Sequence, residues 1–360
     1  MAAELTMEVP IADILKRLDS TAQDHVSVIQ DTAGRLNEDI YLVGGPVRDL
    51  MLGRDSIDLD IVVRDDGIRF ATLLANRIKG SDLTVYRERL TATIAVPGRR
   101  HIDVATMRTE VYDRPGALPR VEAAPDILRD LSRRDFTINA MAVKLDGADR
   151  TDLVDPFDGH GDLASSVVRA LHPESFIDDP TRIYRAIRFE VRLGFRIETQ
   201  TLKALKGAVS GGSLKTISGQ RRMKEINIYL AEEKPFVFIR RAYELGALAD
   251  IVSDHKTLED IKGMYEKIMS TRSVTPEDRR LLLLAAMFVH LTPNEVSIKA
   301  GYFGMTKRQR ATITDTMLLL NAIGGDPSRI KSVMRRYTDR SRLLAYLITN
   351  SGLLLPYISL

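Results

Sequence analysis

The sequence predicts an α+β protein in which a mixed α/β head precedes an all-helical neck, body and tail. Two observations support this class. Short apolar runs of strand length alternate with helical patterns along the first part of the chain. After Met141 the strand signals fade, and apolar residues recur at helical spacing with Pro and Gly breaks between segments. We therefore expect a head at residues 1–145, a helical neck at 146–235 and a helical body and tail at 236–360.

Composition limits the classes of protein that the chain can form. A chain of 360 residues is too long for one ordinary domain, and 44% hydrophobic with 28% charged residues is typical of a soluble globular protein. The absence of cysteine excludes disulfides, thiol catalysis and cysteine-bound zinc. No leader pattern or membrane-length apolar run is present, so we expect a cytoplasmic protein with no membrane partner. The net charge of +3 permits a nucleic-acid partner without indicating one.

The head elements follow from the spacing of apolar residues and from turn residues. Apolar residues at helical spacing predict a first helix at 11–36, and DIYLVGG predicts a strand that runs into a turn. A short helix over VRDLML follows, because proline precedes it and Gly53 comes just after its end. The remaining expected head elements are a strand over SIDLDIVV, an amphipathic helix at 67–78, and strands over TATIAV and HIDVAT around a Pro-Gly turn.

Two aspartates, Asp58 and Asp60, interrupt the apolar strand SIDLDIVV. Residues i and i+2 of a strand face the same side, about 6.5–7 Å apart, so both carboxylates point together while their neighbours face the core. Like charges repel and aspartate is disfavoured in strands, so a compensating cation is expected. A solvated face of an edge strand is the simpler interpretation of the pair alone. Asp103, isolated among apolar residues in HIDVAT, offers a third carboxylate, or else a turn residue at a strand end.

The Gly44-Gly45 turn lies between a predicted strand and a predicted helix. Backbone N–H groups at such a turn can approach phosphates closely, and the helix dipole favours anions there. Arg48 and Arg54 lie nearby in the sequence, and the alternative is an ordinary tight turn. Beside paired carboxylates, however, a phosphate cradle can hold a magnesium-bound nucleotide. Two such ions about 4 Å apart can clamp the attacking and leaving oxygens.

The stretch GGPVRDLMLGRDSIDLD resembles the head-domain signature of class II tRNA nucleotidyltransferases and bacterial poly(A) polymerases, members of the polymerase-β-like superfamily. The resemblance extends from about Ile40 to Pro235 and implies a polymerase-β-like nucleotidyltransferase head. It implies that three carboxylates are catalytic and hold Mg²⁺ in a two-metal site, and that the glycine turn holds the triphosphate. The implied catalytic and metal-binding residues are Asp58, Asp60 and Asp103, and the implied triphosphate-binding residues are Gly44, Gly45 and Arg48.

Two further segments carry the resemblance. RRDFTINAMAV is similar to the family segment that contacts the incoming nucleotide's sugar. The alternative is that Asp135 and Thr137 start a helix in which Asn139 is a polar residue with its hydrogen bonds satisfied. In DDPTRIYRAIRF, Asp179 suits an N-cap and Pro180 the first helical position. This matches the family's acidic-x-x-Arg element, in which aspartate accepts from the amine of cytosine or adenine and arginine donates to ring acceptors. The candidate nucleotide-binding residues here are Arg134, Asp135, Asn139, Asp179, Arg182, Arg185 and Arg188.

Basic residues recur every three or four positions after Arg182, which places a basic stripe along one predicted helix. A solvated helix face would explain such a run, but one dominant sign of charge favours phosphate groups and therefore an RNA end. ISGQRRMKEI is similar to the family's Ser-Gly-Glu-Arg-x-x-x-Glu element, with Gln220 where glutamate is usual. Its Arg221 and Glu225 are suited to bracing the neck. The candidate RNA-binding residues are Arg192, Arg196, Lys203, Arg221 and Arg222.

The resemblance implies nucleotide transfer to RNA, in which the 3′-hydroxyl of a tRNA attacks the α-phosphate of ATP or CTP and pyrophosphate leaves. The tRNA would be held at its 3′ end and at its acceptor and elbow region. The segment between Asp103 and Arg133 is long enough for the flexible loop that relatives use in switching to ATP, so we favour an activity that includes A addition. Addition of the complete CCA end and addition of the terminal A alone are both compatible with this interpretation.

Other functions stay open. A poly(A) polymerase or a CC-adding enzyme would use the same head, although poly(A) polymerases usually carry a basic C-terminal extension, unlike LAYLITNSGLLLPYISL. A non-catalytic RNA-binding protein would not need three aspartates in a metal-ready arrangement. DNA binding by the helix-turn-helix-like residues 291–313 is the least favoured, and we expect no DNA partner. No histidine is followed by aspartate, which argues against a fused phosphohydrolase activity.

Overall fold

The computed structural model describes residues 14–54, 58–97, 100–145, 153–271, 274–324 and 338–349. The chain forms two compact units. The first contains Met1–Asp179 and Arg192–Ala204, and the second contains Pro180–Val191 and Leu205–Leu360. Two helices, α7 (Thr181–Leu193) and α8 (Thr199–Ser210), therefore contribute residues to both units. The finer division at residues 145 and 235 stays a prediction.

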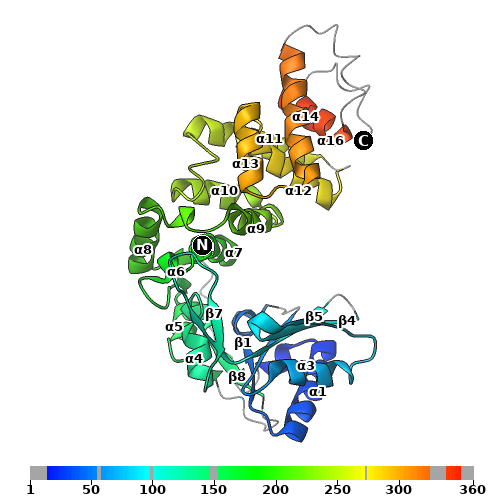
Figure 1. Ribbon diagram of the computed structural model, residues 1–360, viewed down its shortest axis with the longest axis vertical. Coiled ribbons are helices and arrows are strands. Elements are labelled where there is room, and N and C mark those ends of the chain that lie inside the picture. Colours follow the sequence, from blue (N-terminus) through cyan, green and yellow to red (C-terminus); the bar gives the residue numbers. More distant parts are fainter. Residues whose placement is uncertain are drawn as a thin grey trace. The chain divides into compact units, whose positions relative to one another are not determined.

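The first unit is built on a seven-stranded mixed sheet with the strand order β3-β4-β5-β2-β1-β8-β9 (Figure 1). Strands β2 and β5 are parallel, whereas the other neighbouring pairs of this sheet are antiparallel. This arrangement confirms the predicted mixed α/β head. The strands are β1 (Ile40–Val43), β2 (Leu59–Val63), β3 (Asp82–Tyr86), β4 (Thr91–Val96), β5 (Arg100–Thr106), β8 (Ala142–Lys144) and β9 (Leu153–Val154).

Three strands of this sheet, β3, β8 and β9, were not predicted. The residues of β3 alternate between exposed and half-buried, so this edge strand has no strongly apolar face to reveal it. The helix expected to start near Asp135 is a single 3₁₀ turn, Thr137–Asn139, because Ala142–Lys144 pair with β1 and extend the sheet. The predicted strand start at residues 56–57 lies outside the described residues.

Helices α1 (Ser20–Leu36) and α3 (Gly67–Ala75) complete the head. Helix α3 contacts β4 and β5, and α1 contacts α3. Asp19 and Asp66 cap the two helices, each by accepting from a backbone N–H three residues later. Gly67 permits the close packing of α3, because a Cβ there would lie 2.6 Å from the backbone of β5. The core of this layer includes Ile29, Leu42, Ile61, Phe70 and Val104, each at most 1% exposed.

The remainder of the first unit is made of short elements. Strands β6 (Arg108–Val111) and β7 (Arg120–Ala123) form a separate antiparallel hairpin, and α4 (Ile127–Ser132) follows it. Leu131 of α4 belongs to the same apolar cluster as Val62 of β2, so α4 is fixed against the central strands. The other elements are α5 (Gly159–Ala164), α6 (Ser175–Asp178) and the parallel pair β10 (Val167–Val168) and β11 (Arg196–Ile197).

The second unit is helical, as predicted. Tyr184 of α7 is fully buried in it and donates from its hydroxyl to the Ala247 carbonyl oxygen at 2.9 Å. Helix α7 begins at Thr181 rather than at Pro180, the position expected from the sequence. In the described part of the chain, no helix has the length and apolar character needed to cross a membrane. The other helices are α9 (Gly219–Leu230), α10 (Pro235–Glu244), α11 (His255–Ser270), α12 (Pro276–Ala286), α13 (Pro293–Tyr302), α14 (Lys307–Gly324) and α16 (Asp339–Thr349).

The helix-turn-helix-like segment at residues 291–313 contains α13 and the start of α14. Gly304 between them has a φ of +61°, a left-handed conformation that glycine adopts without strain. Thr292 and Glu295 form a capping box that fixes the start of α13. The two helices were therefore correctly expected, while DNA binding by them stays a prediction.

Candidate active site

Two aspartates lie directly opposite each other in the head sheet. Strands β2 and β5 run parallel with Asp60 in register with Asp103, and Asp58 immediately precedes β2. This confirms the expectation that Asp103 stands on the strand beside the Asp58 and Asp60 pair. Leu59 and Ile61 alternate with them and are buried, at 3% and 1% exposed. Strand periodicity therefore turns the aspartates away from the core.

Each outer carboxylate of this group has a defined partner. The Thr93 hydroxyl of β4 donates to Asp103 Oδ1 at 2.5 Å, and the His101 backbone N–H donates to Asp58 Oδ1 at 3.0 Å. The middle residue, Asp60, is half-buried. Burial and the negative charges of Asp103 and Asp58 raise the pKa of Asp60 to about 6, and nearby Arg134 and Arg48 only partly oppose this. The three carboxylates therefore lie close together at a partly buried position, where the ionised form of Asp60 is destabilised.

The donor chemistry of these three aspartates fits a hard divalent cation. Such a cation binds carboxylate oxygens and stabilises the ionised form of neighbouring carboxylates. It would therefore offset the burial and the like charges that raise the pKa of Asp60. Among the residues that the structure describes, no three or more His, Cys, Asp or Glu side chains are grouped closely enough to hold a metal ion by themselves. A catalytic Mg²⁺ usually takes only one or two carboxylates and completes its shell with water and substrate phosphates. The register pair Asp60 and Asp103 matches that requirement.

The glycine turn lies against this carboxylate group. Gly44, with φ of 71° and ψ of −126°, precedes helix α2 (Gly45–Met51). A Cβ on Gly44 would lie 2.7 Å from Arg134 Nη1 and 4.0 Å from Asp60 Oδ2. The positive φ favours glycine at this position, and a side chain there would displace the end of Arg134. The turn, Arg134 and Asp60 form one small site in the first unit.

Three predicted nucleotide-binding residues form a hydrogen-bonded chain behind the turn. Arg48, 6% exposed, donates from Nη1 to Asn139 Oδ1 at 2.7 Å. Asn139 Nδ2 in turn donates to Asp135 Oδ1 at 3.0 Å. Arg48 is also bound to the carboxylate of Asp49. The structure thus brings Arg48 to Asn139, 91 residues away in sequence, and through it to Asp135. Much of the Arg48 guanidinium is directed toward these protein partners and Asp49.

Asp130 is a site residue that the sequence analysis missed. It is 0% exposed, and its Oδ2 accepts from Arg134 Nη2 at 2.8 Å and from Arg134 Nε at 3.3 Å. Its Oδ1 accepts from Arg133 Nη2 at 2.9 Å and from the Arg108 backbone N–H at 3.1 Å. Asp130 therefore holds Arg134 at the glycine turn. The signal in the sequence is an acidic residue within an apolar helix, with arginines at i+3 and i+4.

Asp130 should make the free energy of unfolding depend on pH in a defined direction. Burial acts to raise its pKa, but the charges and hydrogen bonds of Arg134 and Arg133 outweigh burial and lower the pKa below the usual 3.8. Its stabilisation is therefore present above that usual value and is lost as pH falls through the lower, folded-state value. We expect the difference in unfolding free energy between wild type and Asp130→Asn to shrink below about pH 4. Urea unfolding near neutral and at acidic pH measures it; a pH-independent difference would contradict the ion-pair role.

The remaining candidates are distributed over both units. Asp179 belongs to the first unit and flanks the end of α6, whereas Arg182, Arg185 and Arg188 lie on the part of α7 in the second. Arg192, Arg196 and Lys203 are exposed in the first unit. Arg221 is half-buried at the start of α9. These placements leave their predicted roles untested.

Arg222 needs correction. It is 4% exposed and its two terminal nitrogens donate to the Asp250 carboxylate at 2.7 and 2.6 Å, while Nε donates to the Tyr184 hydroxyl at 3.0 Å. These contacts join α7 and α9 to the segment after α10. We therefore withdraw Arg222 from the proposed RNA contacts, because its side chain is buried and its charge is paired with Asp250.

Comparison with known proteins agrees with this arrangement. Residues 40–169 match the family described as "Poly A polymerase head domain", and residues 194–258 match "Probable RNA and SrmB- binding site of polymerase A". The A-adding tRNA nucleotidyltransferase of Geobacter sulfurreducens is 45% identical over 215 residues, which are 60% of this chain and 24% of that protein. The A-adding enzyme of Halalkalibacterium halodurans is 37% identical over 218 residues, 59% of this chain and 50% of that protein. The matched region thus spans about a quarter to a half of these curated relatives.

Solved structures give a match over nearly the whole chain. The apo form II of a CCA-adding enzyme has a TM-score of 0.79 and 30% identity, covering 97% of this chain and 84% of that one. The Thermotoga maritima CCA-adding enzyme, complexed with tRNA, has a TM-score of 0.75 and 28% identity with the same coverage. The fold and the paired carboxylates beside a glycine turn define a protein of the polymerase-β-like nucleotidyltransferase class. Within that class, the chain belongs to the family of class II tRNA nucleotidyltransferases and bacterial poly(A) polymerases.

Proposed function

We propose that the protein is a template-independent RNA nucleotidyltransferase that adds nucleotides to the 3′ end of tRNA from ATP or CTP and releases pyrophosphate. The observation that carries the proposal is the register pair Asp60 and Asp103 beside the Gly44 turn and Arg134. Relatives support the substrates: CCA-adding enzymes 28% identical to this chain are known in complex with CTP, with ATP and with tRNA. These substrates favour a cytoplasmic site of action.

The chemistry follows from the positions of the head residues. Asp58, Asp60 and Asp103 would hold Mg²⁺. When bound, this ion would lower the pKa of the RNA 3′-hydroxyl and neutralise charge on the phosphate. The Gly44 turn lets a triphosphate approach the backbone, and Arg134 offers a fixed positive charge beside it. The RNA 3′-hydroxyl loses its proton to solvent, and its oxygen bonds to the α-phosphorus as the bond to pyrophosphate breaks. Alignment of these groups supplies much of the rate.

Asp135 and Asn139 are proposed to face the sugar of the incoming nucleotide. Their mutual hydrogen bond and the contact of Asn139 with Arg48 fix the orientation of both side chains. A polar pair held in this way discriminates by geometry, because a sugar that lacks the matching hydroxyl leaves a buried polar group unsatisfied. We therefore propose that this pair contributes to selecting a ribonucleotide.

Asp179 and Arg182 are proposed to select the base. Aspartate accepts from the exocyclic amine that adenine and cytosine share, and uracil has no such amine. We expect Asp179→Ala to lower ATP incorporation about tenfold or more while UTP incorporation changes little, because only the amine contact is lost. Single-turnover incorporation of each of the four nucleotides measures this. Equal loss for all four would assign Asp179 a structural role instead.

We propose that the product is the terminal A added to tRNA that already ends in CC. The relatives named A-adding, at 45%, 40% and 37% identity, support this over complete CCA addition. The test uses labelled ATP and CTP with three tRNA transcripts that end before CCA, after C and after CC. Extension of only the CC-ended transcript is expected. CCA on the shortest transcript would indicate a self-sufficient enzyme, CC alone a CC-adding enzyme, and a ladder of A residues a poly(A) polymerase.

A further inference from the structure

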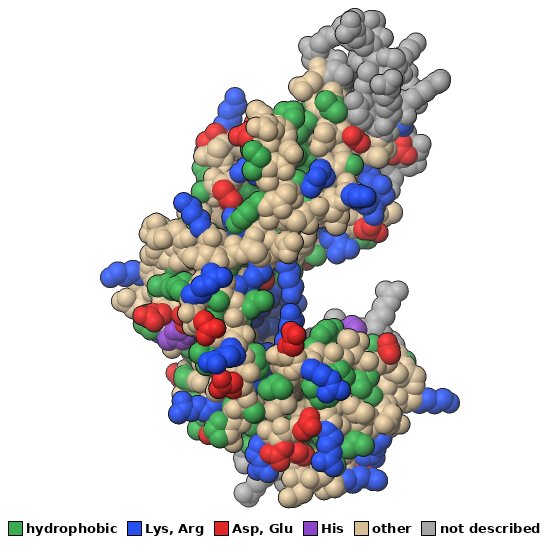
Figure 2. Space-filling view, in the orientation of Figure 1, with side chains coloured by type: hydrophobic (Ala, Val, Ile, Leu, Met, Phe, Trp, Pro, Cys, Tyr) green, Lys and Arg blue, Asp and Glu red, His purple; other side chains and the backbone are tan. Residues whose placement is uncertain are grey.

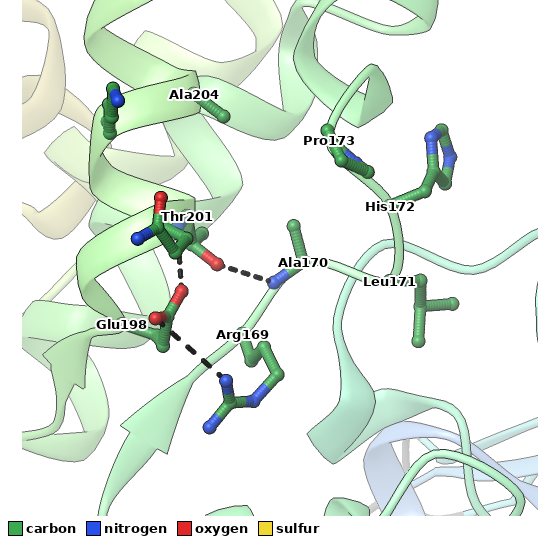
Figure 3. Close-up of a pocket in the computed structure, with 10 residues that line it drawn as sticks. Arg169, Ala170, Leu171, His172, Pro173, Glu198, Thr201 and Ala204 are labelled. Atoms are coloured by element: carbon green, nitrogen blue, oxygen red, sulfur yellow. Dashed lines mark hydrogen bonds and ion pairs between the residues drawn. The ribbon is translucent and has the colours of Figure 1, made fainter.

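A cavity of about 520 Å³ opens in the first unit between the segment after β10 and the first turns of α8. Figure 3 shows this segment, from Arg169 to Pro173, passing the helix, with open space between Ala204 and Pro173. Leu171, Pro173 and Ala204 supply apolar surface, and Arg169, Thr201 and Lys203 are among the polar lining residues. Its volume is that of pockets that bind small organic groups. None of the candidate catalytic aspartates lines it.

The wall formed by the helix is held in place by hydrogen bonds. Thr201 Oγ1, in a residue 5% exposed, accepts from the Ala170 backbone N–H at 3.1 Å, and Figure 3 shows this bond bridging the two walls. The Thr201 backbone N–H donates to Glu198 Oε2 at 2.7 Å, so the N-terminus of α8 is already capped. The two walls are therefore joined by a hydrogen bond, and Glu198 already occupies the end of the helix.

The opposite wall is continuous with the proposed sugar-binding segment. The Thr137 backbone N–H donates to the Arg169 carbonyl oxygen at 3.0 Å, and the Leu171 N–H donates to the Asp135 carbonyl oxygen at 3.4 Å. Phe136 forms a β-bridge with Ala170. The segment after β10 that lines the cavity is thus hydrogen-bonded to the segment that carries Asp135. A ligand in the cavity would be separated from Asp135 by this one segment.

The charged residues that line the cavity limit the class of ligand that it can bind. Arg169 donates to the Asp162 carboxylate, with Nε to Oδ2 at 3.0 Å, and lies 3.9 Å from Glu198, so its charge is balanced. Lys203 makes no ion pair or hydrogen bond with any residue that the structure describes. The lining therefore offers one uncompensated cation. That charge suits one phosphodiester of an RNA chain, whereas a nucleoside triphosphate carries several negative charges.

We propose that this cavity holds one unpaired nucleotide of the RNA substrate, with its phosphate at Lys203 and its base against Leu171, Pro173 and Ala204. His172 supplies the one aromatic ring among the lining residues, and such rings support unstacked RNA bases. A base must be out of a helix to enter a concave pocket, so the ligand is single-stranded RNA rather than a duplex. The proposal rests on the proposed function only in taking RNA as the substrate.

The test measures RNA binding without catalysis. The full chain is titrated with a CC-ended tRNA transcript in EDTA, without ATP, over a range of salt concentrations. Lys203→Ala and the cavity-filling Ala204→Leu should each weaken binding about tenfold. Lys203→Ala should also make the slope of log K against log salt shallower by about 0.7, the value for one phosphate of a single strand. The matched control is Lys206→Ala, which removes the same charge from the same helix outside the cavity lining and should leave affinity unchanged.

Two results would overturn the proposal. One is tRNA binding by Lys203→Ala and Ala204→Leu that equals wild type. The other is an unchanged RNA affinity with a raised KM for ATP, which would make the cavity a site for free nucleotide. Failure of the proposed function is distinguishable from both. A wild-type protein that binds tRNA through Lys203 and Ala204 but incorporates no nucleotide would refute the proposed function and support the cavity.

Discussion

Replacing Asp60 with alanine is expected to lower nucleotide incorporation by about a thousandfold or more while leaving tRNA binding nearly intact. Asp60 is the central carboxylate of the site: it is in register with Asp103, and a Cβ on Gly44 would lie 4.0 Å from its Oδ2. In the proposed reaction, the substitution would remove a carboxylate ligand of the Mg²⁺ that neutralises charge on the transferring phosphate. Single-turnover incorporation of labelled AMP into CC-ended tRNA, with tRNA affinity measured in parallel, gives both quantities.

The matched control for Asp60→Ala is Asp82→Ala. Asp82 is an exposed aspartate on β3, in the same sheet and separated from β2 by β4 and β5. Its removal changes the charge of the sheet by the same amount and should leave incorporation unchanged. Activity of Asp60→Ala within about tenfold of wild type would contradict the proposed role of the carboxylate group, because a lost metal ligand costs far more.

Replacing Asp130 with asparagine is expected to have the second largest effect, and on nucleotide binding as well as stability. The substitution leaves the guanidinium of Arg134 without its carboxylate partner beside the Gly44 turn. Removing one member of a buried ion pair costs about 3–5 kcal/mol of stability. If Arg134 binds the triphosphate as proposed, its loss of position should raise KM for ATP about tenfold or more, with a smaller change in KM for tRNA. Steady-state kinetics at a temperature where the variant is folded measures this split.

Glu110→Gln is the control for Asp130→Asn. Glu110 Oε1 accepts from Arg133 Nη1 at 2.7 Å. Glu110→Gln therefore removes the ion pair with Arg133 and leaves the ion pair of Asp130 with Arg134 intact. We expect some loss of stability and little change in KM for ATP. If both variants lose stability and neither changes KM for ATP, Asp130 is a structural residue and does not position Arg134 for the nucleotide.

The carboxylate group was predictable because its signals are local. Strand periodicity places Asp58 and Asp60 on one face from their spacing alone, and the isolated Asp103 in an apolar strand marks the neighbouring strand. The parallel pairing of β2 with β5 then brings Asp60 opposite Asp103. The Gly44 turn was likewise expected, since glycine before a short helix suits a left-handed φ.

Asp130 and Arg222 were harder to predict. The arginine partners of Asp130 are local, but its burial and one of its hydrogen bonds, like the Asp250 partner of Arg222, depend on residues distant in sequence. Asp130 is fully buried, and the charges and hydrogen bonds of Arg134 and Arg133 lower its pKa, while the Arg108 backbone N–H of strand β6 also donates to it. Arg222 continued a basic stretch in sequence, yet its partner Asp250 lies 28 residues away. Charge patterning shows where basic residues gather but not which of them the fold neutralises.

Short elements were also missed where tertiary pairing outweighed local preference. The segment after Asp135 carries apolar spacing compatible with a helix, but Ala142–Lys144 instead pair with β1 in the sheet. The cavity of the first unit depends on the segment after β10 and the start of α8, which are 31 residues apart in sequence and joined by the bond from Ala170 to Thr201. Single-sequence patterns contain no signal for such a contact.

The most direct test of the account is transfer to a single RNA end. Wild-type protein, Mg²⁺ and α-labelled ATP are incubated with CC-ended tRNA that carries either a 3′-hydroxyl or a 3′-deoxy terminus, and labelled tRNA and released pyrophosphate are both quantified. The account predicts one AMP added and one pyrophosphate released per 3′-hydroxyl end, and neither with the 3′-deoxy tRNA. Pyrophosphate release that is independent of the RNA terminus, or no incorporation into tRNA at all, would contradict it.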